Sequence, residues 1–117
     1  MGGAVLEIVF ATRKLQRDCE DQKESIRKYG SLRAKLMRRR LDDLRAAEAL
    51  VDIRALPQTR CHELKGNRAG QFSVDLDHPY RLLFEVADNP IPVGSTGGID
   101  WTCVRSIRIL GVEDTHE

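Results

Sequence analysis

Residues 71–86, QFSVDLDHPYRLLFEV, contain two short runs in which every second residue is apolar. The apolar positions are Phe72, Val74 and Leu76 in the first run and Tyr80, Leu82, Phe84 and Val86 in the second. A period of two residues is typical of a strand that buries one face. Between the runs, Asp77-His78-Pro79 favours a turn, because proline fixes its own φ and restricts the residue before it. This stretch therefore predicts an antiparallel hairpin with His78 in its turn.

Two further strands are expected, one near each end of the chain. Alternation over residues 5–11 predicts the first, and residues 101–110, with Ile107 and Ile109 on one side and Arg108 on the other, predict the last. Residues 88–100 are rich in Gly and Pro, so we expect a mobile loop there.

The first half of the chain has the pattern of helices. Thr12 is placed to cap a helix that runs to Tyr29, where Gly30 interrupts it and Ser31 offers a new cap. In the second helix, one arc of about 120° holds the apolar residues Leu32, Leu36, Leu44, Ala47 and Leu50. Arg33 and Arg40 fall in the same arc, either reaching solvent at its edge or lining a groove between helix and sheet. Pro57 marks the end of this helical half.

Helices first and strands last predict an α+β fold, in which a first strand and the helices pack on one face of a small, largely antiparallel sheet. The 117 residues, 41% of them hydrophobic and 32% charged, fit a single domain over 1–117. No apolar run approaches the roughly 20 residues of a membrane-spanning helix. The widely spaced Cys19, Cys61 and Cys103 favour neither a disulfide framework nor a zinc site. We expect buried or half-buried thiols in the cytoplasm, with no metal or other cofactor.

The net charge of +1 hides an uneven distribution of charge. Residues 27–45 hold eight basic and two acidic residues, a local net charge of +6, whereas residues 113–117 hold three carboxylates. Such a basic segment attracts polyanions, although most charge runs are simply solvated helix faces.

Two segments resemble a known family. CHELKGNRAGQFSVDLDHPYRLLF (residues 61–84) and the ending VEDTHE (residues 112–117) are similar to the plasmid-maintenance killer proteins, the HigB-like branch of the RelE/ParE toxin superfamily. The shared features are an H-x-L-K-G loop, a G-Q-F strand, a strand with an aromatic residue before Arg, and a terminal E-D-x-H. The resemblance covers nearly the whole chain. It implies a RelE-like fold and a toxin that cleaves mRNA on the translating ribosome, held inactive by a helix-turn-helix (HigA-like) antitoxin.

The resemblance also implies a catalytic set of His62, Lys65, Arg81, Asp114 and His116. Metal-independent cleavage needs a base at the ribose 2′-OH, an acid at the leaving 5′-oxygen and cations on the phosphorane, and it yields a 2′,3′-cyclic phosphate and a 5′-OH. Either imidazole suits proton transfer near neutral pH. Lys65 and Arg81 can bind phosphate, and Asp114 can orient an imidazole. We expect Arg33, Arg40 and Arg68 to bind RNA.

Each of these residues also has a plainer interpretation. His62 can be an exposed loop residue, residues 65–68 an ordinary charged turn, and Arg81 an ion-pair partner of Asp75 or Glu85. The chain also departs from the family pattern, with Thr115 where relatives have tyrosine and Leu76 where some have a second arginine. Two alternatives therefore stay open: a toxin of the same fold that blocks a protein such as DNA gyrase, or a non-catalytic RNA-binding module.

Overall fold

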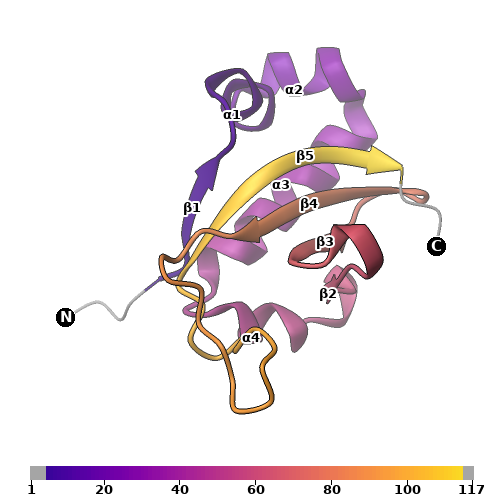
Figure 1. Ribbon diagram of the computed structural model, residues 1–117. Coiled ribbons are helices and arrows are strands. Elements are labelled where there is room, and N and C mark those ends of the chain that lie inside the picture. Colours follow the sequence, from indigo (N-terminus) through magenta and orange to yellow (C-terminus); the bar gives the residue numbers. More distant parts are fainter. Residues whose placement is uncertain (1–4, 115–117) are drawn as a thin grey trace.

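The computed structural model describes residues 5–114, which form a five-stranded sheet with helices packed against it (Figure 1). The strands are β1 (Glu7–Phe10), β2 (His62–Glu63), β3 (Gln71–Asp75), β4 (Tyr80–Val86) and β5 (Ser106–Asp114). The helices are α1 (Arg13–Glu20), α2 (Gln22–Tyr29), α3 (Ser31–Ala46) and α4 (Leu50–Arg54), with the 3-10 turns η1 (Pro57–Thr59) and η2 (Gly66–Arg68). No helix in this described part is long and apolar enough to cross a membrane.

The strand order across the sheet is β1-β5-β4-β3-β2. Only β1 and β5 run parallel, so the predicted α+β fold with a largely antiparallel sheet is confirmed. The predicted hairpin is β3–β4, in which Phe72 lies opposite Phe84 and Val74 opposite Leu82. Its turn closes where the Tyr80 amide donates to the Asp77 carbonyl at 2.7 Å.

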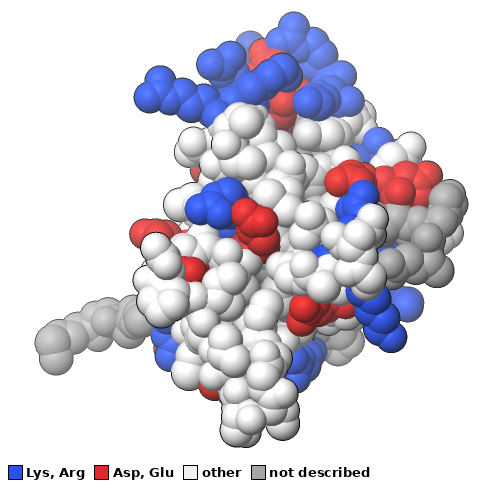
Figure 2. Space-filling model, viewed as in Figure 1, with Lys and Arg blue, Asp and Glu red and all other residues white. Residues whose placement is uncertain are grey.

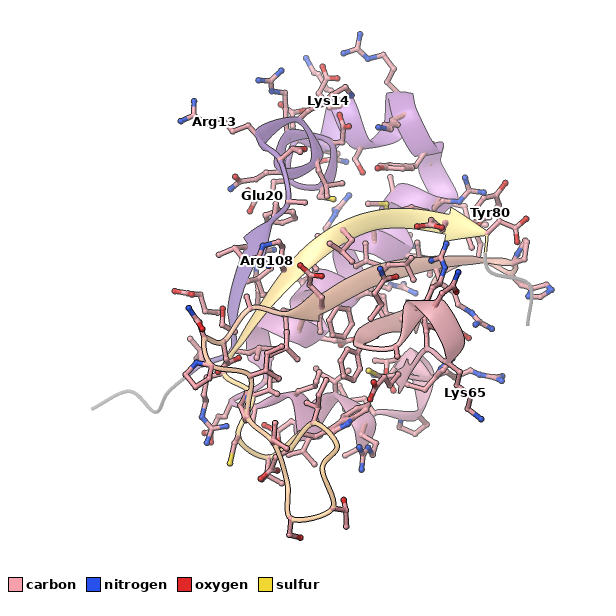
Figure 3. All side chains as sticks on the ribbon, in the orientation of Figure 1. Arg13, Lys14, Glu20, Lys65, Tyr80 and Arg108 are labelled. Carbon is pink, nitrogen blue, oxygen red and sulfur yellow. The ribbon has the colours of Figure 1, made fainter. Side chains whose placement is uncertain are left out.

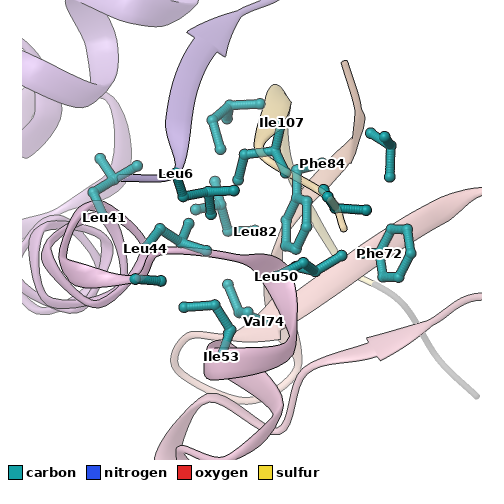
Figure 4. Close-up of a cluster of buried hydrophobic side chains, with 14 of the residues drawn as sticks. Leu6, Leu41, Leu44, Leu50, Ile53, Phe72, Val74, Leu82, Phe84 and Ile107 are labelled. Carbon is teal, nitrogen blue, oxygen red and sulfur yellow. The ribbon is translucent and has the colours of Figure 1, made fainter. Parts of the chain in front are cut away.

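The core lies between this sheet and the helices α3 and α4 (Figure 4). Phe72 and Phe84 stack with their ring centroids 5.5 Å apart, and Trp101 meets Phe72 edge-on at 5.0 Å. The buried side chains from α3, α4 and the three central strands are Met37, Leu41, Leu44, Leu50, Ile53, Val74, Leu82, Ile107 and Ile109. The apolar alternation of the strands therefore sets which face of the sheet the helices cover.

The first helical segment is two helices rather than the single one predicted. Thr12 caps α1 as expected, since its hydroxyl accepts from the Leu15 amide at 3.0 Å. Asp21 then ends α1 in an extended conformation and caps α2 by accepting from the Glu24 amide. Ser31 is not the cap of α3, because Gly30 occupies that position and no side chain caps the helix.

The buried face of α3 is also rotated from the predicted arc. Leu32 is 62% exposed and Leu36 only half-buried, whereas Ala34, Met37, Leu41 and Leu44 are buried. The spacing 37, 41 and 44 follows one side of a helix, and this side faces the sheet. The predicted arc was wrong because it continued one helix to Leu50, whereas α3 ends at Ala46 and Leu50 belongs to α4.

The last strand begins later than predicted, at Ser106 rather than residue 101. The Asp100 side chain accepts from the amide and hydroxyl of Thr102 and holds a turn there. The Asp88 carboxylate accepts from the amides of Arg105 and Ser106 and so fixes the start of β5. Within residues 88–100, Val93 and Ile99 form a bridge, and the mobility of this loop stays a prediction.

Candidate active site

The face of the sheet turned away from α3 carries polar residues in two adjacent rows. In the first row, the register aligns His62 of β2 with Ser73 of β3, and Ser73 with Leu83 of β4. In the second row, Asp75 of β3 lies opposite Arg81 of β4, and Arg81 lies opposite Glu113 of β5. Directly opposed residues of antiparallel strands share a face of the sheet. The fold therefore brings His62 and Arg81 to one surface, which we call the polar face.

His62 has a defined orientation on the polar face although its side chain is exposed. Its Nδ1 atom lies 3.1 Å from the backbone carbonyl of Arg60. A carbonyl oxygen only accepts, so this hydrogen bond requires a proton on Nδ1. In the neutral ring, Nε2 is then the atom with a free lone pair, and it can accept a proton.

Arg81 lies beside Asp75, with 3.4 Å between its Nε and the Asp75 Oδ1. This confirms the ion pair that the sequence left open for Arg81. The side chain is 18% exposed, and its Nη1 atom is buried with no hydrogen-bond partner. A buried donor without a partner is costly and is rare in native proteins. Nη1 of Arg81 is therefore a donor that the described residues leave unsatisfied, whereas the exposed 18% of the side chain is the part within reach of an anion.

Lys65 lies in the loop between β2 and β3, just before η2, and its side chain is exposed (Figure 3). The same loop crosses the polar face, because Arg68 of η2 donates to the Glu113 carboxylate of β5 at 2.5 Å. Lys65 thus adds an exposed positive charge to the loop that crosses the polar face.

The structure does not bring Asp114 to the polar face. Asp114 lies opposite Tyr80 in the register, one position beyond the pair formed by Arg81 and Glu113. Successive residues of a strand point to opposite faces, so of these two neighbouring carboxylates Glu113 is the one on the polar face. His116 and Thr115 lie outside the described residues.

The arginines predicted to bind RNA have partners within the protein. Arg33 donates to both carboxylate oxygens of Asp77, at 3.0 Å and 3.1 Å for the shorter contacts, and stacks on the Tyr80 ring at 3.5 Å. Arg40 donates to the Asp75 carbonyl at 2.8 Å. Both residues therefore fasten α3 to the β3–β4 hairpin. This favours the helix–sheet groove among the two interpretations from the sequence and gives Arg33 and Arg40 a structural use.

The Arg33 guanidinium also lowers the pKa of the Asp77 carboxyl below its ordinary value, mainly through their hydrogen bonds. The same contact raises the pKa of Arg33. The pair stays charged over the whole physiological range.

Positive charge on the surface is concentrated on the helices instead. Figure 2 shows lysine and arginine side chains gathered over α1 and α2, at the top of the view. On α3, Lys35, Arg38 and Arg39 are exposed as well. The charge asymmetry expected from the sequence is therefore present, and RNA binding by Arg33, Arg40 and Arg68 stays a prediction.

Sequence reasoning missed two residues next to the predicted set. Arg60 directs its side chain to Asp75, with 3.4 Å between its Nε and the Asp75 Oδ2. Ser73 is fully buried opposite His62, and its hydroxyl has no hydrogen-bond partner. A spacing of two residues could have indicated both, because alternate residues of an extended segment share a face. Arg60 lies two residues before His62, and Ser73 lies two residues before Asp75. Without the short strand β2, which was not predicted, neither could be aligned with the site.

Comparisons with known proteins identify the family of this chain. Residues 8–93 match a family described as the RelE-like toxin of the type II toxin–antitoxin system HigB. The chain is also 32% identical over 83 residues to Toxin HigB-1 of Vibrio cholerae serotype O1, an alignment that covers 71% of this chain and 86% of that toxin. The family match includes His62, Lys65 and Arg81 and ends before β5.

Proposed function

Because the chain belongs to the HigB-like family of RelE-like toxins, and so is a toxin with an antitoxin partner, we propose that it acts by cutting messenger RNA on the translating ribosome. One observation supports this proposal: His62, with its Nδ1 bound to a carbonyl, shares a sheet face with Arg81, whose side chain is partly exposed. A base and a cation on one face are the minimum for attack of a ribose 2′-OH on the adjacent phosphorus.

His62 is proposed as the general base. Its Nε2 takes the proton of the 2′-OH while the oxygen attacks phosphorus, and the Arg60 carbonyl stabilises the imidazolium that forms, through the Nδ1 proton. The Arg60 carbonyl thus has the role that a carboxylate has in a Ser-His-Asp triad, where it accepts from Nδ1 of the catalytic histidine.

Arg81 and Lys65 are proposed to stabilise the phosphorane. The exposed part of the Arg81 guanidinium donates to a non-bridging oxygen, and the exposed amine of Lys65 adds positive charge. Strand spacing and rise put the Cα atoms of His62 and Arg81 roughly 12 Å apart. Side chains that converge from that separation leave room for one phosphate group.

The leaving 5′-oxygen needs a proton donor, which the family resemblance assigns to His116, with Asp114 beside it in the chain. The bond from phosphorus to the 5′-oxygen then breaks, leaving a 2′,3′-cyclic phosphate and a 5′-OH. Because imidazoles and cations supply all these steps, the proposed reaction uses no metal ion. The partners are mRNA and the ribosome in the cytoplasm, with a HigA-like helix-turn-helix antitoxin.

The test is incubation of the purified chain with ribosomes carrying a defined mRNA, in the presence of EDTA. We expect new 5′-OH ends within the mRNA and cyclic phosphate on the upstream fragment. Intact mRNA together with inhibited gyrase supercoiling would favour a toxin that blocks a protein. Intact mRNA with salt-sensitive RNA binding and no growth arrest would favour an RNA-binding module.

A further inference from the structure

A single carboxylate on the polar face lies between two guanidinium groups from different elements. The Asp75 Oδ1 is 3.4 Å from the Nε of Arg81, and its Oδ2 is 3.4 Å from the Nε of Arg60. Arg81 comes from β4, whereas Arg60 comes from the turn between η1 and β2. Asp75 thus lies within ion-pair distance of two cations that are far apart in the sequence, and its Oδ1 makes no hydrogen bond.

Both arginines meet Asp75 through Nε, so their outer nitrogens point elsewhere. Nη1 of Arg81 is buried without a partner, and the Arg60 side chain is 76% exposed. Guanidinium groups bind phosphate through these outer nitrogens, often two at a time.

The backbone at Arg60 is held in an unusual conformation. Its φ of 45° and ψ of 46° are left-handed, and Arg60 is the one non-glycine residue with positive φ among residues 5–114. Glycine takes this conformation without cost, whereas a residue with a Cβ does not. Such backbone strain is often found at functional sites, so it is consistent with a functional role for the Arg60 side chain.

We propose that Arg60 and Arg81 bind the scissile phosphodiester from two sides, and that Asp75 is the positioning residue that sets their separation. This inference rests on the proposed nuclease function and adds to it a second phosphate-binding arginine. Asp75 does not touch the substrate, since like charges repel. Its role is to hold both guanidinium groups in place before RNA binds.

The experiment compares the variants Arg60→Gly and Asp75→Asn with the wild type, using Arg108→Ala as the matched control. Arg108 lies on β5 and pairs with Glu85 at 2.8 Å, a similar ion pair outside the candidate site. Single-turnover cleavage is measured on ribosomes that carry a defined mRNA, and binding on the same complex with a 2′-deoxy residue at the cut position of the mRNA. Arg60→Gly relieves the left-handed strain, so its melting temperature should not fall.

We expect Arg60→Gly to slow cleavage about 100-fold, as the loss of one donor to a transition-state anion does, and to weaken binding of the deoxy RNA. Asp75→Asn should bind the deoxy RNA at least as tightly as the wild type does, because a negative charge is gone. It should nevertheless cleave the unmodified RNA about tenfold more slowly. Arg108→Ala should match the wild type in both measurements.

Wild-type cleavage by Arg60→Gly would overturn the role of Arg60. If Asp75→Asn loses binding and cleavage equally and its melting temperature falls as well, Asp75 only stabilises the fold and does not position the two arginines. If the wild type cuts no RNA, the proposed function fails, and binding of the deoxy RNA still decides this inference. Weaker binding by Arg60→Gly than by Arg108→Ala then supports the two-arginine site, and equal binding contradicts it.

Discussion

The three cysteines occupy three different environments, and only part of this was predicted. Cys19 is buried and Cys61 half-buried, as expected, whereas Cys103 is exposed. Burial raises the pKa of the Cys19 thiol to about 12, and it raises the pKa of Cys61 to about 12 as well. Since the thiolate is the reactive form, both should resist alkylation in the folded protein.

We therefore predict that iodoacetamide at pH 8 modifies the folded chain once, at Cys103, and the unfolded chain at all three cysteines. Mass spectrometry of the intact protein counts the labels. The variant Cys103→Ser should take up none while folded. Rapid labelling of Cys19 or Cys61 in the native state would contradict the burial described for them.

The ion pair between Arg33 and Asp77 predicts a dependence of stability on pH. Arg33 lowers the pKa of Asp77 in the folded state, so the pair stabilises the fold above the unfolded-state pKa of about 3.9. This contribution is lost as the pH falls through the lower, folded-state value. Asp77→Asn should thus lower the free energy of unfolding by about 1 kcal/mol at pH 7.

Urea unfolding at pH 7 and at pH 3 measures this difference. The gap between wild type and Asp77→Asn should shrink at the lower pH, and Asp42→Asn, an exposed residue of α3, serves as the control. A gap that stays constant between the two pH values would show that the charge of Asp77 does not matter.

Residues of the site were predictable only in part, for a physical reason. His62, Lys65 and Arg81 belong to short motifs that are visible in the chain, and the strand register brings His62 and Arg81 to one face. Arg60 and Asp75 meet through a left-handed turn and a two-residue strand, features that leave almost no periodic signal. A contact of this kind becomes visible only when the register is known.

Among the elements, α3 offers the clearest test of which face is buried. Leu41 is 1% exposed in the core and Leu32 62% exposed, although both are leucines of one helix. Leu41→Ala should lower the free energy of unfolding by about 3 kcal/mol, because it leaves a cavity. Leu32→Ala should change it by less than about 0.5 kcal/mol. Denaturant unfolding of both variants checks this, and similar losses would mean that the helix is rotated.

Helix caps give a second matched pair of variants. The Thr12 hydroxyl accepts from the Leu15 amide, whereas no side chain caps α3 at Ser31. Thr12→Ala should cost about 1 kcal/mol, and Ser31→Ala close to nothing. Thermal unfolding followed by circular dichroism measures both effects. A larger loss of stability for Ser31→Ala than for Thr12→Ala would contradict the assignment of Gly30 as the cap of α3, and would favour Ser31 as its cap.

Elements with a strong period were predicted well, and their ends were not. The β3–β4 hairpin follows from alternation alone, and its register is fixed by the buried pairs Phe72–Phe84 and Val74–Leu82. The break at Asp21 has neither glycine nor proline to mark it. The start of β5 depends on the Asp88 carboxylate, 18 residues before Ser106, and such distant hydrogen bonds leave no local pattern.

In the whole molecule, most exposed basic residues and the candidate active site lie on different surfaces. Lysine and arginine side chains gather on α1 and α2, whereas the polar face mixes cations with the carboxylates of Asp75 and Glu113 (Figure 2). We infer that the helical surface attracts RNA from a distance, and that the polar face orients one phosphate.

The central claim is that His62 and Arg81 act on one phosphodiester. Its most direct test is the single-turnover rate of mRNA cleavage by His62→Ala, with His78→Ala in the β3–β4 turn as the control. We predict that His62→Ala cuts at least about 100-fold more slowly, as expected for the loss of a general base, while His78→Ala cuts at the wild-type rate. Equal rates for His62→Ala and the wild type would contradict it.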